Sequence, residues 1–161
     1  MAERASRPAT IEDLKRLLKA LRDEGAEYLL IGGYALNALG YQRATTDIDL
    51  LLPRSAATGA SVKRALLVLP DGAAKDLDPA WFEEGDTIRV ADEFVVDLMF
   101  NSCGETYESL LKHQVTIDLD GIPVRTLDLE GMLKTKQSQR EKDRLDRLAL
   151  ERALEDAKRS Q

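Results

Sequence analysis

A seven-residue apolar run, residues 94–100, carries one carboxylate, Asp97, at its centre. The β-branched and aromatic residues of the run predict a buried strand. An ionised carboxylate is costly to bury there unless a positive charge compensates it. The compensating group is either a metal ion or an Arg or Lys side chain in a buried salt bridge. The run therefore predicts a sheet that carries a charged group.

Two more carboxylates, Asp47 and Asp49, lie in a second predicted strand, residues 47–52. Alternate side chains of a strand share a face, so the two acids point the same way. They repel each other unless a positive group lies between them, and Mg²⁺ with oxygen ligands is the natural solution. The other interpretation is a solvated strand end that carries two acids by chance.

Asp97, on a neighbouring strand, favours the metal site over a solvated strand end. Two ions held by Asp47, Asp49 and Asp97 would serve phosphoryl-type transfer, one activating the attacking oxygen and the other steadying the leaving pyrophosphate. Asp97 would then lower the pKa of the attacking hydroxyl or act as its base. The sequence therefore predicts Asp47, Asp49 and Asp97 as both metal ligands and catalytic residues.

A glycine pair, Gly32 and Gly33, ends the predicted strand of residues 27–31 and opens a short helix, residues 34–39. Backbone amides at a helix start can hold phosphate oxygens, and glycine lets a ligand approach closely. A Gly-Gly pair is more often only a tight turn, but its place just upstream of the acidic strand favours a phosphate-binding role.

The remaining segments predict an α/β (α+β) domain, a mixed sheet flanked by helices. Asp120 and Gly121 mark the turn of one hairpin, Thr10 or Ala9 opens the first helix, and Asp128 caps a later one. The expected helices are residues 11–23, 61–69, 105–112, 129–137 and 141–158, residues 76–84 form a loop with one helical turn, and the expected strands are residues 87–90, 114–119 and 122–125.

Composition is typical of one globular domain spanning residues 1–161, with 43% hydrophobic and 32% charged residues. The formal net charge of −6 argues against overall attraction to nucleic acid, so any such contact needs a local basic patch. The sequence has no long apolar run and no signal-peptide start. With one cysteine, it predicts a cytoplasmic protein without a membrane partner.

Together, these motifs resemble those of the nucleotidyltransferase superfamily with the polymerase-β-like fold. That signature is a Gly-Gly or Gly-Ser helix start, an Asp-x-Asp strand and a later single acid. Here Gly32-Gly33, Asp47-Ile48-Asp49 and Asp97 follow in that order. The segment between the glycines and the Asp-x-Asp strand is most similar to that of the AbiEii-like toxin nucleotidyltransferases and their uncharacterised relatives. The resemblance covers residues 27–100 and 127–148. It implies a domain with a catalytic core over residues 27–100 and C-terminal helices over residues 127–158.

The resemblance also assigns nucleotide-binding residues. Gly32 and Gly33 belong to them, and Lys134 would contact the triphosphate, with Arg140 or Lys142 nearby. Arg43 and Thr45 stand at two further positions typical of the family, where they would contact phosphates or position the acidic strand. A solvated basic helix face is an equally good interpretation for three other residues, Lys136, Arg144 and Arg147.

The resemblance implies a transferase that uses Mg²⁺ or Mn²⁺ and moves a nucleoside monophosphate from an NTP to a hydroxyl. The acceptor is an RNA, a protein or a small molecule, and the setting is a toxin–antitoxin or phage-defence system with a cognate partner. Larger members have an extra helical domain that grips the acceptor, and this chain ends too soon for one. One alternative is an antibiotic-modifying nucleotidyltransferase. Another is a non-catalytic, antitoxin-type protein that acts by binding a partner.

Four other residues are expected to have packing roles rather than chemistry. We expect His113 at the surface or a strand edge, Cys103 as a packed thiol, and Trp81 with Phe82 in core or loop packing. The apolar positions of residues 141–158 predict that this helix packs on the domain or on another subunit.

Overall fold

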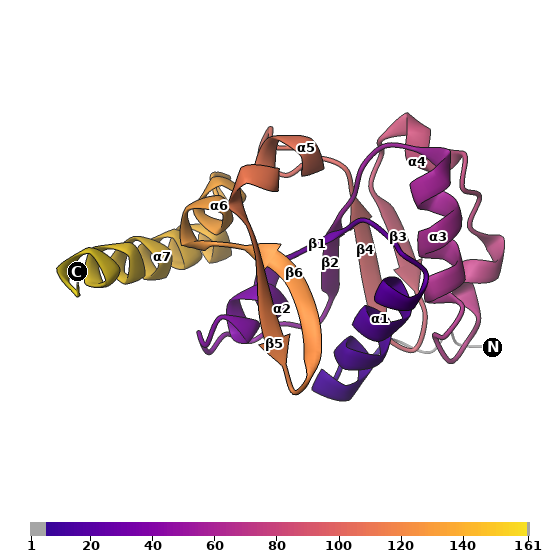
Figure 1. Ribbon diagram of the computed structural model, residues 1–161, viewed down its shortest axis with the longest axis horizontal. Coiled ribbons are helices and arrows are strands. Elements are labelled where there is room, and N and C mark those ends of the chain that lie inside the picture. The colour runs from indigo at the N-terminus through magenta and orange to yellow at the C-terminus, as the bar shows by residue number, and fades with distance from the viewer. Residues whose placement is uncertain (1–5, 161) are drawn as a thin grey trace.

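The computed structural model describes residues 6–160 and has a four-stranded mixed sheet at its centre (Figure 1). The strand order is β1-β2-β4-β3, with β2 and β4 parallel and the two outer pairs antiparallel. The mixed sheet flanked by helices is the architecture that the sequence predicted. The strands are β1 (Leu29–Ile31), β2 (Ile48–Leu51), β3 (Ile88–Ala91) and β4 (Val95–Met99).

The two faces of this sheet differ in burial. Ile48 and Leu50 of β2, with Val96 and Leu98 of β4, are fully buried in the core. Of the residues that alternate with them, Asp49, Asp97 and Met99 are only half-buried, whereas Leu51 and Val95 are buried. Because strand side chains alternate between faces, one face of the sheet forms the core and the other is free for chemistry.

Two helices, α1 (Ile11–Asp23) and α3 (Ala56–Leu66), pack against each other and contribute to the core (Figure 1). Of the two residues predicted to open α1, Thr10 is the cap, and it forms a capping box with Asp13. The prediction for α3 was wrong at its start, which lies five residues before Ser61. Ser55 supplies the cap there, because its side chain accepts a hydrogen bond from the Thr58 amide.

The β5–β6 hairpin, β5 (Gln114–Leu119) and β6 (Ile122–Leu127), turns at Asp120-Gly121 as predicted. It lies beside β1, and the Thr126 hydroxyl donates a hydrogen bond of 2.7 Å to the Leu30 carbonyl. The hairpin therefore packs against β1, at the edge of the four-stranded sheet.

The C-terminal part consists of α6 (Leu129–Lys134) and α7 (Glu141–Arg159), with Asp128 capping α6 as predicted. The predicted helix of residues 129–137 is three residues too long, because the chain turns after α6 at Thr135, whose hydroxyl bonds to the Met132 carbonyl at 2.7 Å. Much of α7 extends away from the rest of the molecule (Figure 1). Leu150 is buried, whereas Leu145 and Leu148 are more than half exposed, so the packing predicted for these two leucines is not made in this chain.

The N-terminal segment forms hydrogen bonds both to the loop before β2 and to the turn between β3 and β4. The Ala9 amide donates to the Thr46 carbonyl, and the Tyr34 hydroxyl donates to the Ala9 carbonyl at 2.5 Å. The Arg7 amide and guanidinium both bond to Glu93, in the turn between β3 and β4. The segment thus supports the loop that leads into β2 and the β3–β4 turn at once.

Short elements complete the chain, and no helix within residues 6–160 is long and apolar enough to cross a membrane. The predicted helix of residues 105–112 is divided into two shorter pieces, and the glycine pair itself begins the second helix. The short elements are α2 (Gly32–Ala38), η1 (Ala73–Asp76), α4 (Trp81–Glu84), α5 (Tyr107–Leu110) and η2 (Leu111–His113).

Candidate active site

The three predicted acids gather on the open face of the sheet. Asp49 of β2 lies directly opposite Asp97 of β4 in the parallel register, so their side chains share a face. Asp47 lies one residue before β2, rather than inside the strand as the sequence predicted. All three line one hollow of about 710 Å³, a volume typical of small-molecule sites.

Asp49 is the most strongly perturbed of the acids. Burial raises its pKa to about 6, the Asp97 and Asp47 carboxylates add to the rise, and Lys136 and Lys142 partly offset it. The pKa of Asp97 is also raised, first by burial and then by Asp47, against the opposing effect of Arg89. A cation that enters between the two carboxylates therefore stabilises their ionised forms.

The glycine pair has a packing role that the structure makes explicit. Gly32 has a φ of +76°, and a side chain there would collide with the Asp49 carboxylate. A side chain at Gly33 would collide with Arg43 and with Thr45. Because neither glycine has a side chain, Asp49, Arg43 and Thr45 can lie against the start of α2.

Arg89 is a functional candidate that the sequence analysis missed. It pairs with Asp97 in the β3–β4 register, and its guanidinium lies 3.3 Å from both the Asp47 and Asp97 carboxylates. The salt bridge considered for Asp97 therefore exists, but Arg89 is 58% exposed and shared between two acids. Positions 89 and 97 are equally far from Glu93 in the hairpin turn, and that symmetry could have revealed the pair.

The acids offer the right ligands for a divalent cation, although they are not yet closed around one. Among residues 6–160, no three His, Cys, Asp or Glu side chains converge closely enough to hold a metal ion. Three carboxylates facing one hollow are nevertheless the hard oxygen ligands that Mg²⁺ prefers, and Arg89 already holds a positive charge between two of them. The donor set fits a divalent cation once Arg89 withdraws.

Basic side chains also line this hollow; together they are called its basic wall, and the three carboxylates its acidic wall. Arg43, Lys136, Arg140 and Lys142 line it, and Thr45 adds a hydroxyl. Counting Arg89, five cationic side chains face three carboxylates among the described lining residues, in a chain whose net charge is −6. The hollow therefore concentrates cationic side chains in an acidic chain, and three of them, Arg43, Lys136 and Arg140, are paired with Asp143 or Asp146.

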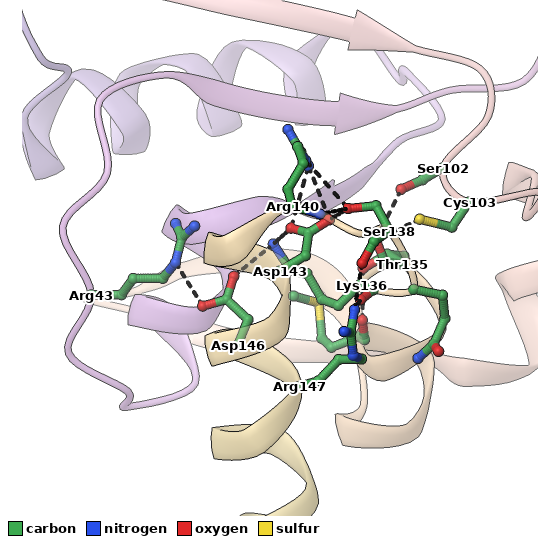
Figure 2. A network of polar contacts seen from close by, with 12 residues as sticks. Arg43, Ser102, Cys103, Thr135, Lys136, Ser138, Arg140, Asp143, Asp146 and Arg147 are labelled. Atoms are coloured by element: carbon green, nitrogen blue, oxygen red, sulfur yellow. Dashed lines mark hydrogen bonds and ion pairs between the residues drawn. The ribbon is translucent and has the colours of Figure 1, made fainter.

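An ion-pair network anchors this basic wall (Figure 2). The buried Lys136 ammonium lies 3.0 Å from Asp146 and 3.8 Å from Asp143, both of which are buried on α7. Arg43 donates to the other oxygen of Asp146 at 2.8 Å, and Arg140 lies 3.1 Å from Asp143. The network joins the loop before β2, the turn after α6 and the first turns of α7.

Asp143 is held in its charged form at the centre of that network. Burial alone would raise its pKa, but hydrogen bonds from Ser138 and Arg140 and the charge of Lys136 outweigh burial and lower the pKa. Arg147 adds hydrogen bonds of 2.5 and 2.7 Å to the Lys136 and Ser138 carbonyls. The backbone that carries Lys136 is therefore fixed on both sides.

Lys134, which the resemblance places beside the triphosphate, does not line this hollow. It is exposed and lines a different hollow with Cys103 and Glu105. Because α6 ends at Lys134, the chain turns before Lys136, and Lys136 is the lysine that reaches the acids' hollow. Lys136, for which the sequence predicts a solvated helix face as readily as a phosphate contact, is buried.

Two further expectations need correction. His113 is buried rather than at the surface, with its Nδ1 atom 3.1 Å from Asp128, because Gly131 leaves room for it beneath α6. Cys103 is exposed rather than packed, because the turn closed by Ser102 and Glu105 places it at a φ of 51°.

The expected packing of Trp81 and Phe82 holds for one of the two residues. Phe82 is fully buried and meets the Phe100 ring edge-on at 5.3 Å, whereas Trp81 is 42% exposed. The phenylalanine therefore serves the core, as predicted for the pair.

The arrangement matches a solved structure along almost its whole length. The chain is similar to a crystal structure of a Thermotoga maritima protein described as a candidate nucleotidyltransferase, with a TM-score of 0.56 and 14% sequence identity. The match covers 94% of this chain and 93% of that chain. The chain therefore has a nucleotidyltransferase fold, as its sequence predicted. No family model and no curated protein matches the sequence.

Proposed function

We propose that the chain is a divalent-cation-dependent nucleotidyltransferase that moves a nucleoside monophosphate from an NTP to a hydroxyl. The observation that carries the proposal is that one hollow is lined both by three carboxylates and by the cations of the basic wall. That combination suits a metal-bound triphosphate better than it suits a purely structural salt-bridge cluster. The nucleotidyltransferase fold supports the same conclusion.

The basic wall would hold the triphosphate. Lys136 is fixed by two buried carboxylates, so its ammonium is oriented before a ligand arrives. Arg140 and Lys142 are exposed at the same hollow and would contact the outer phosphates. Arg43 and Thr45 lie against Gly33, close to the acidic strand, and would orient the phosphate that reacts.

The acidic wall would hold Mg²⁺ or Mn²⁺ through Asp47, Asp49 and Asp97. The ion would supply charge neutralisation for the phosphates and increase the acidity of the attacking hydroxyl. Asp49 bears most of the electrostatic cost in the free protein, because it is the acid whose pKa burial raises to about 6. Arg89 would leave Asp47 and Asp97 as those carboxylates turn towards the ion.

In the proposed reaction the acceptor hydroxyl oxygen attacks the α-phosphorus of the NTP. A new P–O bond forms to the acceptor, and the bond between the α-phosphorus and the bridging oxygen of pyrophosphate breaks. The hydroxyl proton passes to the carboxylate of Asp97, one of the three acids that line the hollow. Pyrophosphate leaves along the basic wall.

The acceptor class is proposed from resemblance alone. Similarity of the Gly32–Asp49 segment to AbiEii-like toxins supports an RNA or protein acceptor and a role in toxin–antitoxin or phage-defence systems with a cognate partner. An antibiotic-modifying activity on a small-molecule hydroxyl is the alternative that uses the same chemistry. A partner-binding protein without catalysis is the alternative that does not.

The test uses each NTP labelled at the α-phosphate, with Mg²⁺ or Mn²⁺, and offers total RNA, cell lysate or aminoglycosides and lincosamides as acceptors. Asp47→Asn/Asp49→Asn is the inactive variant, and Asp23→Asn is the matched control, since Asp23 is an exposed acid at the end of α1. We expect label on one acceptor class with wild type and Asp23→Asn only. Neither transfer nor nucleotide binding by folded wild-type protein would refute the proposal and favour the partner-binding alternative.

A further inference from the structure

A second hollow opens beside the candidate active site and has a different character. It measures about 430 Å³ and lies between α2, the loop that follows it and α7. Leu36, Tyr41, Leu145, Ala149 and Leu150 give it mainly apolar walls. Its volume is in the range of small-molecule sites, which are apolar with few polar groups.

The two hollows are adjacent and share three lining residues. Arg43, Ala44 and Lys142 line both of them. The Arg43–Asp146 ion pair of 2.8 Å fixes this junction, so the apolar hollow has a set position relative to the basic wall (Figure 2). A ligand with phosphates against the basic wall can therefore extend an apolar part into the second hollow.

The apolar hollow is open to a ligand in the free chain. Leu145 is 55% exposed on α7, and Tyr41 is half-buried with one side packed on the core. An aliphatic side chain and an aromatic ring that line one hollow suit a flat aromatic ligand, which buries apolar area on one and stacks on the other.

We propose that the second hollow is the nucleobase subsite of the nucleotide whose phosphates occupy the acidic and basic hollow. The inference rests on the proposed function and adds where the base lies and how it is recognised. Among the described lining residues, the neutral side chains with hydrogen-bonding groups are Gln42 and Tyr41, while Asp146 is already paired. Recognition is therefore by apolar contact and stacking, and purines bind a few-fold more tightly than pyrimidines because they offer more face.

The test compares two ligands on four proteins by isothermal titration calorimetry in Mg²⁺: ATP and tripolyphosphate. The proteins are wild type, Leu145→Gln, Ala149→Phe, which fills the hollow, and Leu148→Gln. Leu148 is the matched control, because it is 56% exposed on the same helix and lies outside both hollows. Tripolyphosphate carries more charge than ATP, so tighter ATP binding must come from the nucleoside.

We expect wild type to bind ATP about tenfold more tightly than tripolyphosphate, as stacking of one base predicts. Leu145→Gln and Ala149→Phe should lose most of that difference without changing tripolyphosphate affinity or the melting temperature, and Leu148→Gln should keep it. Equal ATP and tripolyphosphate affinity in wild type, or a difference that survives both substitutions, overturns the inference and leaves the proposed function intact.

Two other results also overturn the inference and are distinguishable from these. If neither ligand binds, the proposed function fails and the base subsite with it. If wild type sediments as a dimer that Leu145→Gln dissociates while the ATP preference is unchanged, a second copy of the chain occupies the hollow instead.

Discussion

The two walls of the candidate active site are built by different means. The acidic wall is set by strand register: Asp49, Asp97 and Arg89 lie in one row across β2, β4 and β3. The basic wall is set by ion pairs that join a loop, a turn and a helix, with Lys136 and Asp146 at its centre. Register is local and periodic, whereas ion pairs join residues far apart in sequence, so the two walls should respond differently to substitution.

The largest expected effect is at Asp49. Asp49→Asn should reduce nucleotidyl transfer by at least about a hundredfold, the scale of losing a charged catalytic group. It should not lower the melting temperature, because burial already disfavours the charged form of this side chain. Transfer rates and thermal melts of the one variant check both halves, and an inactive but unfolded protein would contradict this description of the acidic wall.

Lys136 should behave in the opposite way, affecting stability as well as binding. Lys136→Met leaves Asp143 and Asp146 with fewer partners, so we expect a loss of about 2 kcal/mol in urea unfolding and at least about tenfold weaker ATP binding. Lys134→Met is the matched control, since Lys134 is exposed in a different hollow. If Lys134→Met weakened ATP binding more than Lys136→Met, the assignment of the basic wall would be wrong.

The Arg7–Asp13 ion pair of the N-terminal segment should make the free energy of unfolding depend on pH. The Arg7 hydrogen bond, partly opposed by burial, lowers the pKa of Asp13 from 3.8 to about 2. Asp13→Asn should therefore cost about 1 kcal/mol above pH 4, after allowance for solvent screening, and the difference should disappear as the pH falls towards 2. Urea unfolding at several pH values measures it, and a difference that grew below pH 4 would contradict the assigned ion pair.

The smallest effect is expected at Arg89. Arg89→Gln removes the positive charge that lies between Asp47 and Asp97, so Mn²⁺ affinity should rise about threefold in the absence of nucleotide. Arg64→Gln, which removes an exposed arginine paired with Glu24, should leave Mn²⁺ affinity unchanged. Electron paramagnetic resonance of free Mn²⁺ measures the affinity. Weaker binding in Arg89→Gln would mean that Arg89 orients the acids for the ion.

The sequence predicted the acidic wall because strand alternation is visible in it. Asp47, Asp49 and Asp97 could be chosen from their spacing and from the apolar residues around Asp97, and the mixed sheet follows from the same strands. Arg89 was missed because its role appears only when the hairpin register is worked out across the turn.

The basic wall was harder to predict because its geometry depends on where a helix ends. Lys134 and Lys136 are two residues apart, and only the end of α6 decides which lysine faces the hollow. The buried partners of Lys136, Asp143 and Asp146, come from α7, and their charges on a polar helix resemble an ordinary solvated face. The apolar hollow was hidden for the same reason, since it forms between α7 and a distant loop.

The central claim is that this hollow transfers the α-phosphoryl group of an NTP with its nucleoside. The most direct measurement incubates wild type and Asp49→Asn with Mg²⁺ and ATP labelled in parallel at the α- or the γ-phosphate, with the responsive acceptor. Transfer of the α-label only, with stoichiometric pyrophosphate release and loss in Asp49→Asn, is the predicted result. Transfer of the γ-label, or α-label transfer that persists in Asp49→Asn, would contradict the claim.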